Sequence, residues 1–242
     1  MVDSRTRCDG GEDTAVQTTL KLGRITQRTT PGSVADVLRT AILDGTLKPG
    51  SPLRETQLAA EFHVSRAPLR EALAMLADDG LVERIPYRGA FVAEVGAEDI
   101  AEIASLRKRL EPYAIELAKP RLIGDGRAKV VRALDDMAAG ADNSDAAATI
   151  CAHMSFHRAF YELSGHQRLR DLWQSWEAQL QLFFSADHQS FEDLHVVVAE
   201  HRRLLTVIDS GDPDAVAGEL DRHVGGGLPE AEAAAAAAKD AT

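Results

Sequence analysis

The sequence contains few cysteines and few aromatic residues, and it has no long apolar run. Its two cysteines among 242 residues, Cys8 and Cys151, cannot build a disulfide framework, so a reducing compartment is expected. No stretch is apolar over the length that crosses a bilayer, and the polar N-terminus lacks the apolar core of a signal peptide. We therefore expect a cytoplasmic protein with no membrane partner.

Positive charge is also scarce. The chain has 27 lysine and arginine residues against 38 aspartate and glutamate residues, a formal net charge of −11. An acidic surface repels the phosphate backbone, which disfavours a general nucleic-acid binder. A sequence-specific DNA reader needs only a local positive patch, and its binding would depend strongly on salt.

Composition and hydrophobic periodicity divide the chain into four segments. Residues 1–30 are polar and aperiodic, which predicts a flexible leader, and residues 227–242 form a predicted flexible tail. Residues 31–95 and 96–226 form two predicted domains. At the start of the first, Ser33 is expected to cap an amphipathic helix that ends at Gly45.

Residues 53–92 have the layout of a winged helix-turn-helix, which is a DNA-binding fold. A short helix over 55–62 is broken at His63 and Val64, and a second helix follows an N-cap at Ser65. Two short strands, over 80–85 and 90–92, then flank a turn. This second helix and the turn would face DNA.

The second helix and the wing supply the candidate DNA contacts. Arg66 and Arg70 are four residues apart and lie on one helix face, where arginine offers a fork to guanine or phosphate. Each arginine taken singly would more often be an ordinary solvated charge, but the cap, turn and wing favour DNA contact. The predicted contact residues are Ser65, Arg66, Ala67, Arg70, Arg88 and Gly89.

The second domain has helical periodicity throughout and no strand pattern. Helices are predicted near 97–119, 126–139, 146–164, 167–186, 191–210 and 213–224. The predicted fold class is therefore mainly α, with an N-terminal winged helix-turn-helix and a C-terminal all-helical antiparallel bundle.

Histidines concentrate in the bundle. His153 and His157 are four residues apart on one predicted helix, and His201 and His223 lie on the last two. Neutral imidazoles that converge inside a bundle suit a divalent ion, with zinc or nickel the leading choices. The alternative is that these are polar core or surface histidines, which we prefer for His188 and His195.

The first domain resembles the DNA-binding domain of the GntR family of bacterial transcription regulators. The resemblance covers about residues 33–95. It departs from the family at Thr56, where relatives often have arginine. The matching residues are Pro49, Gly50, Leu53, Glu55, Leu58, Ala59, Val64, Ser65, Arg66, Pro68, Arg70, Glu71, Ala72, Leu73, Leu76, Gly80, Leu81, Val82, Arg88, Gly89, Ala90, Phe91 and Val92.

The second domain resembles the FCD effector domain of the FadR subfamily, from about residue 99 to 224. The matching segments are 106–107, 110–112, 156–160, 164–165, 200–202, 211–212 and 222–223. Many FCD domains bind a metal through one aspartate and three histidines. The resemblance places His157, His201 and His223 at the histidine positions and His153 at the aspartate position. It also places Arg107 where an arginine often pairs with a carboxylate ligand.

These resemblances imply a DNA-binding transcription regulator, in most cases a repressor. Family members bind pseudo-palindromic operators as homodimers, and a small effector such as an organic acid would bind at the metal and Arg107. A regulator that senses the metal itself is the alternative. A metal-dependent hydrolase is disfavoured, because the residue after His153 is not the glutamate that zinc proteases use as a base.

Overall fold

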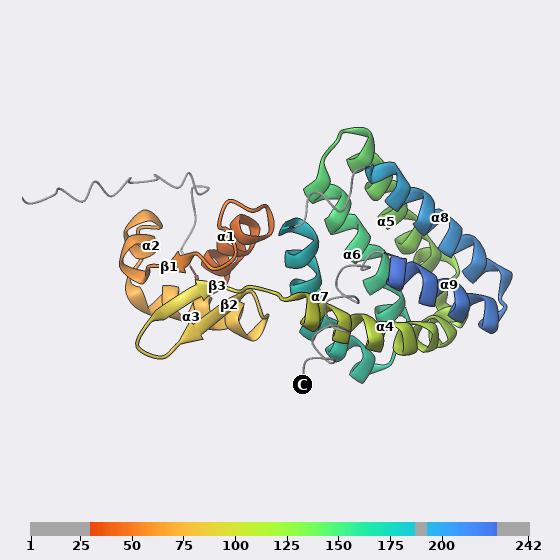
Figure 1. Cartoon of the computed structure of the whole chain (residues 1–242), viewed down its shortest axis with the longest axis horizontal. Coiled ribbons are helices and arrows are strands. Elements are labelled where there is room, and N and C mark those ends of the chain that lie inside the picture. Colours follow the sequence, from red (N-terminus) through yellow and green to blue (C-terminus); the bar gives the residue numbers. More distant parts are fainter. Residues whose placement is uncertain (1–29, 187–192, 227–242) are drawn as a thin grey trace, which may run out of the picture.

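The computed structural model describes residues 30–186 and 193–226, which form two parts (Figure 1). The first part consists of α1 (Pro31–Leu43), β1 (Pro52–Leu53), α2 (Glu55–Glu61), α3 (Arg66–Asp78), β2 (Val82–Ile85) and β3 (Gly89–Val92). The second consists of α4 (Ala97–Ala118), a 3-10 turn (Lys119–Arg121), α5 (Gly124–Asp142), α6 (Ala146–Leu163), α7 (Gln167–Ala186), α8 (Leu194–Ser210) and α9 (Pro213–Gly226). The predicted fold class is confirmed.

The first helix begins three residues earlier than the sequence pattern predicts. Thr30, not Ser33, is its N-cap, and the Thr30 side chain accepts a hydrogen bond from the Ser33 backbone N–H at 3.2 Å. Ser33 Oγ in turn accepts from the Thr30 N–H at 3.0 Å. The prediction of Ser33 as the cap was wrong, because Pro31 can occupy the first helical turn, where its missing N–H costs nothing.

The winged part contains a three-stranded antiparallel sheet in the order β1-β3-β2. β1 is only two residues long, so its sequence shows no alternation that would predict a strand. Between α2 and α3, His63 adopts a left-handed conformation with φ +54°, which turns the chain sharply. Helices α1, α2 and α3 and the sheet enclose one apolar core, to which Leu38, Leu69 and Leu73 contribute.

The bundle helices differ slightly from the predicted ranges. α5 covers residues 124–142 instead of 126–139. Its C-terminal end is extended because Asn143 is the C-cap, and the Asn143 side chain donates a hydrogen bond to the Ala139 carbonyl. α8 begins at Leu194, where the Asp193 side chain caps it. The predicted helix start at 191 and His188 lie outside the described residues. No helix among the described residues is long and apolar enough to span a membrane.

The two parts meet along α7, which lies on the side of the bundle nearest α1 (Figure 1). Leu182 of α7 is only 2% exposed and belongs to the apolar core of the winged part. Gln179, one turn earlier, lies against Gly80 at the end of α3. Helix α7 therefore belongs to both parts of the molecule.

Candidate DNA-binding surface and histidine cluster

The exposed face of α3 carries most of the predicted DNA contacts. Leu69, Leu73 and Leu76 fix the opposite face of α3 in the core, so Arg66 and Ala67 in its first turn are exposed. Ser65 is the N-cap residue but makes no side-chain capping hydrogen bond. Its hydroxyl is therefore not committed to the cap that the sequence pattern predicted.

Arg70 differs from Arg66 in having an internal partner. Its Nε donates to Oε2 of Glu55 on α2 at 2.7 Å, and the Arg70 side chain is still more than half exposed. The ion pair joins the two helices of the helix-turn-helix at the surface, where such pairs add little stability. It does fix the direction of the guanidinium, whose remaining N–H donors stay accessible.

The wing is a tight turn between β2 and β3. Tyr87 and Gly89 both have positive φ, +63° and +107°, and residues 86–89 are exposed. Arg88 lies over the Phe91 ring, with Cζ 5.6 Å from its centroid. Tyr87 projects fully into solvent. The sequence pattern did not single it out, because a turn position predicts exposure and not a role.

Arg54 is a further cation on this surface that the sequence interpretation overlooked. It is exposed at the N-cap of α2, and its side chain makes no hydrogen bond or ion pair with the described residues. Together with Thr56 and Arg88 it lines a hollow of about 560 Å³ between the start of α2 and the wing. Arg54 lies two residues before Thr56, the position where relatives often have arginine, and this proximity is the signal that could have identified it.

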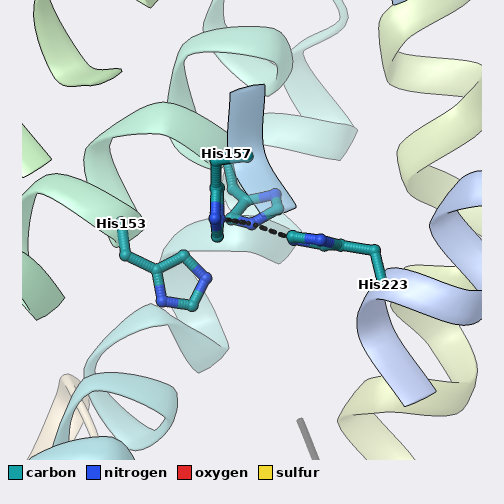
Figure 2. Close-up of side chains that lie close together, drawn as sticks. His153, His157 and His223 are labelled. Atoms are coloured by element: carbon teal, nitrogen blue, oxygen red, sulfur yellow. Dashed lines mark hydrogen bonds between the residues drawn. The ribbon is translucent and has the colours of Figure 1, made fainter. Parts of the chain in front are cut away.

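The four candidate metal ligands converge inside the bundle. His153 and His157 come from α6, His201 from α8 and His223 from α9, and all four are buried. One ring nitrogen from each lies within 4.8 Å of the others. Figure 2 shows His153, His157 and His223 directed toward one another. Cys151 is exposed and takes no part in the cluster.

Hydrogen bonds fix the tautomers of two of these histidines. The Nδ1 of His157 contacts the Glu111 carboxylate, and the Nδ1 of His201 donates to the Val197 carbonyl at 2.7 Å. A neutral imidazole has one N–H, so each Nε2 keeps a lone pair. The two Nε2 atoms are 3.1 Å apart, an unfavourable approach of lone pairs that a shared cation removes.

The remaining nitrogens fit the same interpretation. His223 Nε2 lies 3.3 Å from His157 Nε2, and the buried Nδ1 atoms of His153 and His223 have no hydrogen-bond partner among the described residues. Two nitrogens bound to one tetrahedral zinc at about 2.0–2.1 Å lie about 3.3 Å apart. The distances from His157 to His201 and His223, and the donor types, therefore fit a zinc-like divalent ion.

Burial keeps the cluster uncharged. Desolvation lowers the pKa of His153, His157 and His223 well below its ordinary value, and it lowers the pKa of His201 to about 4. The positive charge of Arg107 acts in the same direction on all four. Neutral imidazole is the form that binds a metal ion.

Three more polar residues lie beside the cluster. Arg107 on α4 is buried over the Trp173 ring. Its Nη2 lies 3.1 Å from Oε2 of Glu111 in an ion pair, but this nitrogen makes no well-aligned hydrogen bond. Tyr161, one turn after His157, has a buried hydroxyl with no partner among the described residues. Burial and the charge of Glu111 raise the pKa of the Tyr161 hydroxyl. Glu111 and Tyr161 were not predicted, although Tyr161 continues the four-residue spacing of the histidines.

An exposed helix-turn-helix with a wing, joined to a bundle with a buried polar cluster, defines a DNA-binding regulator with a separate sensory domain. Residues 30–92 match the model of the gntR family of bacterial regulatory proteins, and residues 102–226 match the FCD domain. The chain belongs to the GntR family of transcription regulators and has an FCD domain.

Relatives and solved structures agree with this membership. The chain is 29% identical to the "Probable D-xylose utilization operon transcriptional repressor" of Paenarthrobacter nicotinovorans, over 85% of this chain and 90% of the relative. It is 26% identical to the gluconate operon transcriptional repressor of Bacillus licheniformis, over 78% and 80%. A GntR regulator structure from Rhodococcus sp. RHA1 has a TM-score of 0.73 at 28% identity and covers 84% of this chain and 98% of its own. The protein is thus a DNA-binding transcription regulator and not an enzyme.

Proposed function

We propose that this regulator represses transcription as a homodimer on a pseudo-palindromic operator in the cytoplasm. In this proposal an organic acid binds beside a zinc or nickel ion in the helical domain and controls DNA binding. The observation that carries the proposed metal site is that the Nε2 atoms of His157 and His201, each with a lone pair, lie 3.1 Å apart. Buried groups rarely face each other this way without a partner between them.

The proposed metal ligands are His153, His157, His201 and His223. When bound, the ion would supply a concentrated positive charge inside the bundle, because four neutral imidazoles leave its charge uncompensated. Such a charge attracts anions, which supports an acidic effector.

Two buried donors support a carboxylate as the effector. Arg107 Nη2 and the Tyr161 hydroxyl both lack a well-aligned hydrogen bond among the described residues, and both side chains contact Trp173. A carboxylate accepts several such bonds, so the proposal assigns Arg107 to the effector and adds Tyr161. One relative is named for the operon of gluconate, a sugar acid.

On the DNA side, the proposed contacts are Ser65, Arg66, Ala67, Arg70, Arg88 and Gly89. The first turn of α3 would enter the major groove, where Ala67 permits close approach and Arg66 reaches base edges. Arg70 is held by Glu55, so its free donors suit a fixed phosphate contact. Arg88 would hold the backbone beside the wing, and Arg54 would supply the positive charge that Thr56 does not.

A metal-sensing regulator is the second candidate, and the ligand count favours it. Four histidine ligands complete a tetrahedral zinc shell and leave no position for an acid, as in structural zinc sites. A six-coordinate ion such as nickel would keep two positions open. The coordination number of the bound ion therefore separates the two candidates.

The DNA-binding assignment predicts a specific loss in an arginine variant. With an operator selected from random duplex DNA, we expect Arg66→Ala to weaken binding by about 1–3 kcal/mol, the cost of one lost base contact. Arg168→Ala removes the same charge from the exposed start of α7 and should leave affinity within twofold. Gel-shift titration measures both, and equal affinities for wild type and Arg66→Ala would reject the role of Arg66.

The metal assignment predicts about one zinc or nickel ion per chain in protein purified without a histidine tag. Elemental analysis measures it, and absence of a stoichiometric metal after incubation with either ion would reject the site. Operator binding is then titrated with metal alone, acid alone and both together. A response only to both supports the acid effector, whereas a full response to metal alone supports the metal sensor.

A further inference from the structure

Glu111 is a buried carboxylate that the proposed metal site does not use as a ligand. It lies on α4, is fully buried, and divides its two oxygens between two partners. Oε1 contacts the Nδ1 of His157, and Oε2 faces Arg107, whose Nε and Nη2 lie at 3.2 and 3.1 Å. A carboxylate held this way has one orientation available to it.

We propose that Glu111 is a positioning residue for the metal, acting through His157, an inference that rests on the proposed metal site. By accepting the N–H at Nδ1, Glu111 fixes the tautomer in which Nε2 has a lone pair. The same bond orients the His157 ring so that Nε2 lies 3.1 Å from that of His201 and 3.3 Å from that of His223. Metal-binding histidines commonly donate their other N–H to such a partner.

Glu111 also supplies the negative charge that the ligands lack. The four histidines are neutral, so a divalent ion among them keeps both of its positive charges unless an anion is near. Glu111 lies one imidazole ring away from that position. His201 donates its hydrogen bond to the backbone carbonyl of Val197, which adds no charge. Arg107 pairs with the other oxygen of Glu111, so the negative charge of Glu111 is shared between Arg107 and the ligand set.

The arrangement links the metal to the effector position. Arg107 contacts Glu111, and Glu111 contacts His157, so a carboxylate ligand that draws Arg107 away changes the environment of the metal ligand. Linkage then requires that the metal and the acid alter each other's affinity by the same factor. Glu111 is the residue through which this coupling passes.

The test compares Glu111→Gln with Glu116→Gln, a matched loss of charge at an exposed position of the same helix. Zinc affinity is measured on the full chain by competition with a chromophoric chelator, and Co²⁺ replaces zinc for visible spectra. We expect Glu111→Gln to bind zinc 10–100-fold more weakly and to alter the Co²⁺ spectrum, while Glu116→Gln matches wild type. Zinc affinity of Glu111→Gln within twofold of wild type overturns the inference.

Two further measurements keep the inference testable if Glu111→Gln does not fold with Arg107 unpaired. The double variant Arg107→Met with Glu111→Gln removes both buried charges, and it should show the same loss of zinc affinity. Nitrogen NMR of metal-free wild type reports the tautomer of His157 directly. Protonation at Nδ1 supports the role of Glu111 in fixing the tautomer, a result that does not depend on metal binding, whereas protonation at Nε2 overturns the inference.

Discussion

Histidine at position 153 gives the proposed metal site four imidazoles and no carboxylate. Related FCD sites are expected to have an aspartate there, and here the His153 ring instead packs against those of His157 and His201, with centroids 4.9 and 4.6 Å away. Imidazole suits zinc, nickel and copper, whereas magnesium and calcium require oxygen ligands. In the proposed site, this one residue would therefore favour zinc, nickel or copper over magnesium and calcium.

The buried histidines predict that metal-free protein loses stability as the pH falls below about 6.5, the ordinary pKa of histidine. Below this pH the histidines of the unfolded chain bind protons. The buried histidines of the folded chain bind them only near their lowered pKa, which is about 4 for His201. Each such histidine lowers the free energy of unfolding by up to about 1.4 kcal/mol per pH unit.

Urea denaturation of chelator-treated protein between pH 7.5 and 5.5 measures this loss. His201→Gln should flatten the pH dependence, whereas His195→Gln changes an exposed histidine and should not. Equal stability of the metal-free wild type across this pH range would contradict the prediction.

Helices α5 and α6 hold the histidine pair in place through a close backbone contact. A Cβ atom at Gly140 would lie 2.6 Å from Thr149 Oγ1 and 2.8 Å from the Thr149 backbone nitrogen. Thr149 is fixed by the hydrogen bond from its hydroxyl to the Asp145 carbonyl at 2.8 Å. Only glycine allows α6 to begin this near to α5, and His153 follows one turn later.

We expect Gly140→Ala to lower the free energy of unfolding by about 1–3 kcal/mol, because the backbone of Thr149 must move. Gly218→Ala is the matched control, since Gly218 is exposed on α9 with nothing within 4 Å of its added Cβ. That change should raise stability by about 0.5–1 kcal/mol through helix propensity. Urea denaturation midpoints compare the two, and a stabilised Gly140→Ala would refute this account of the contact.

Local patterns explain which elements and site residues could be predicted. The four-residue spacing of His153 and His157 marks one helix face, and His201 and His223 lie on later predicted helices of the same bundle. The resemblance to a known family then assigned His157, His201 and His223 to the histidine positions of a metal site. Glu111 could not be found this way, because it is 46 residues from His157 and its role depends on helix packing. β1 was missed for the same reason: two residues form a strand only because β3 lies beside them.

At the scale of the whole molecule, α7 is the element that touches both the histidine cluster and the DNA-binding part. Phe184 packs on His153, with ring centroids 5.3 Å apart. Leu182, only two residues earlier, is buried in the core of the winged part. A small displacement of α7 at the cluster would therefore shift the packing of α1 and α3, since packed cores do not deform continuously.

This arrangement predicts that Leu182→Ala separates sensing from DNA binding. The variant should keep its zinc affinity within about twofold, because Leu182 packs in the core of the winged part. It should lose most of the change in operator affinity that zinc, or zinc with acid, causes. Leu169→Ala is the control: it removes the same atoms from the other end of α7, inside the bundle core, at a similar cost of about 2–5 kcal/mol in stability. Operator titrations with and without ligand, run below the melting temperature of both variants, give the coupling free energy, which is about 1–3 kcal/mol in typical regulators. If Leu182→Ala retains the full response while Leu169→Ala loses it, the signal travels through the bundle and not through the contact of α7 with the winged part.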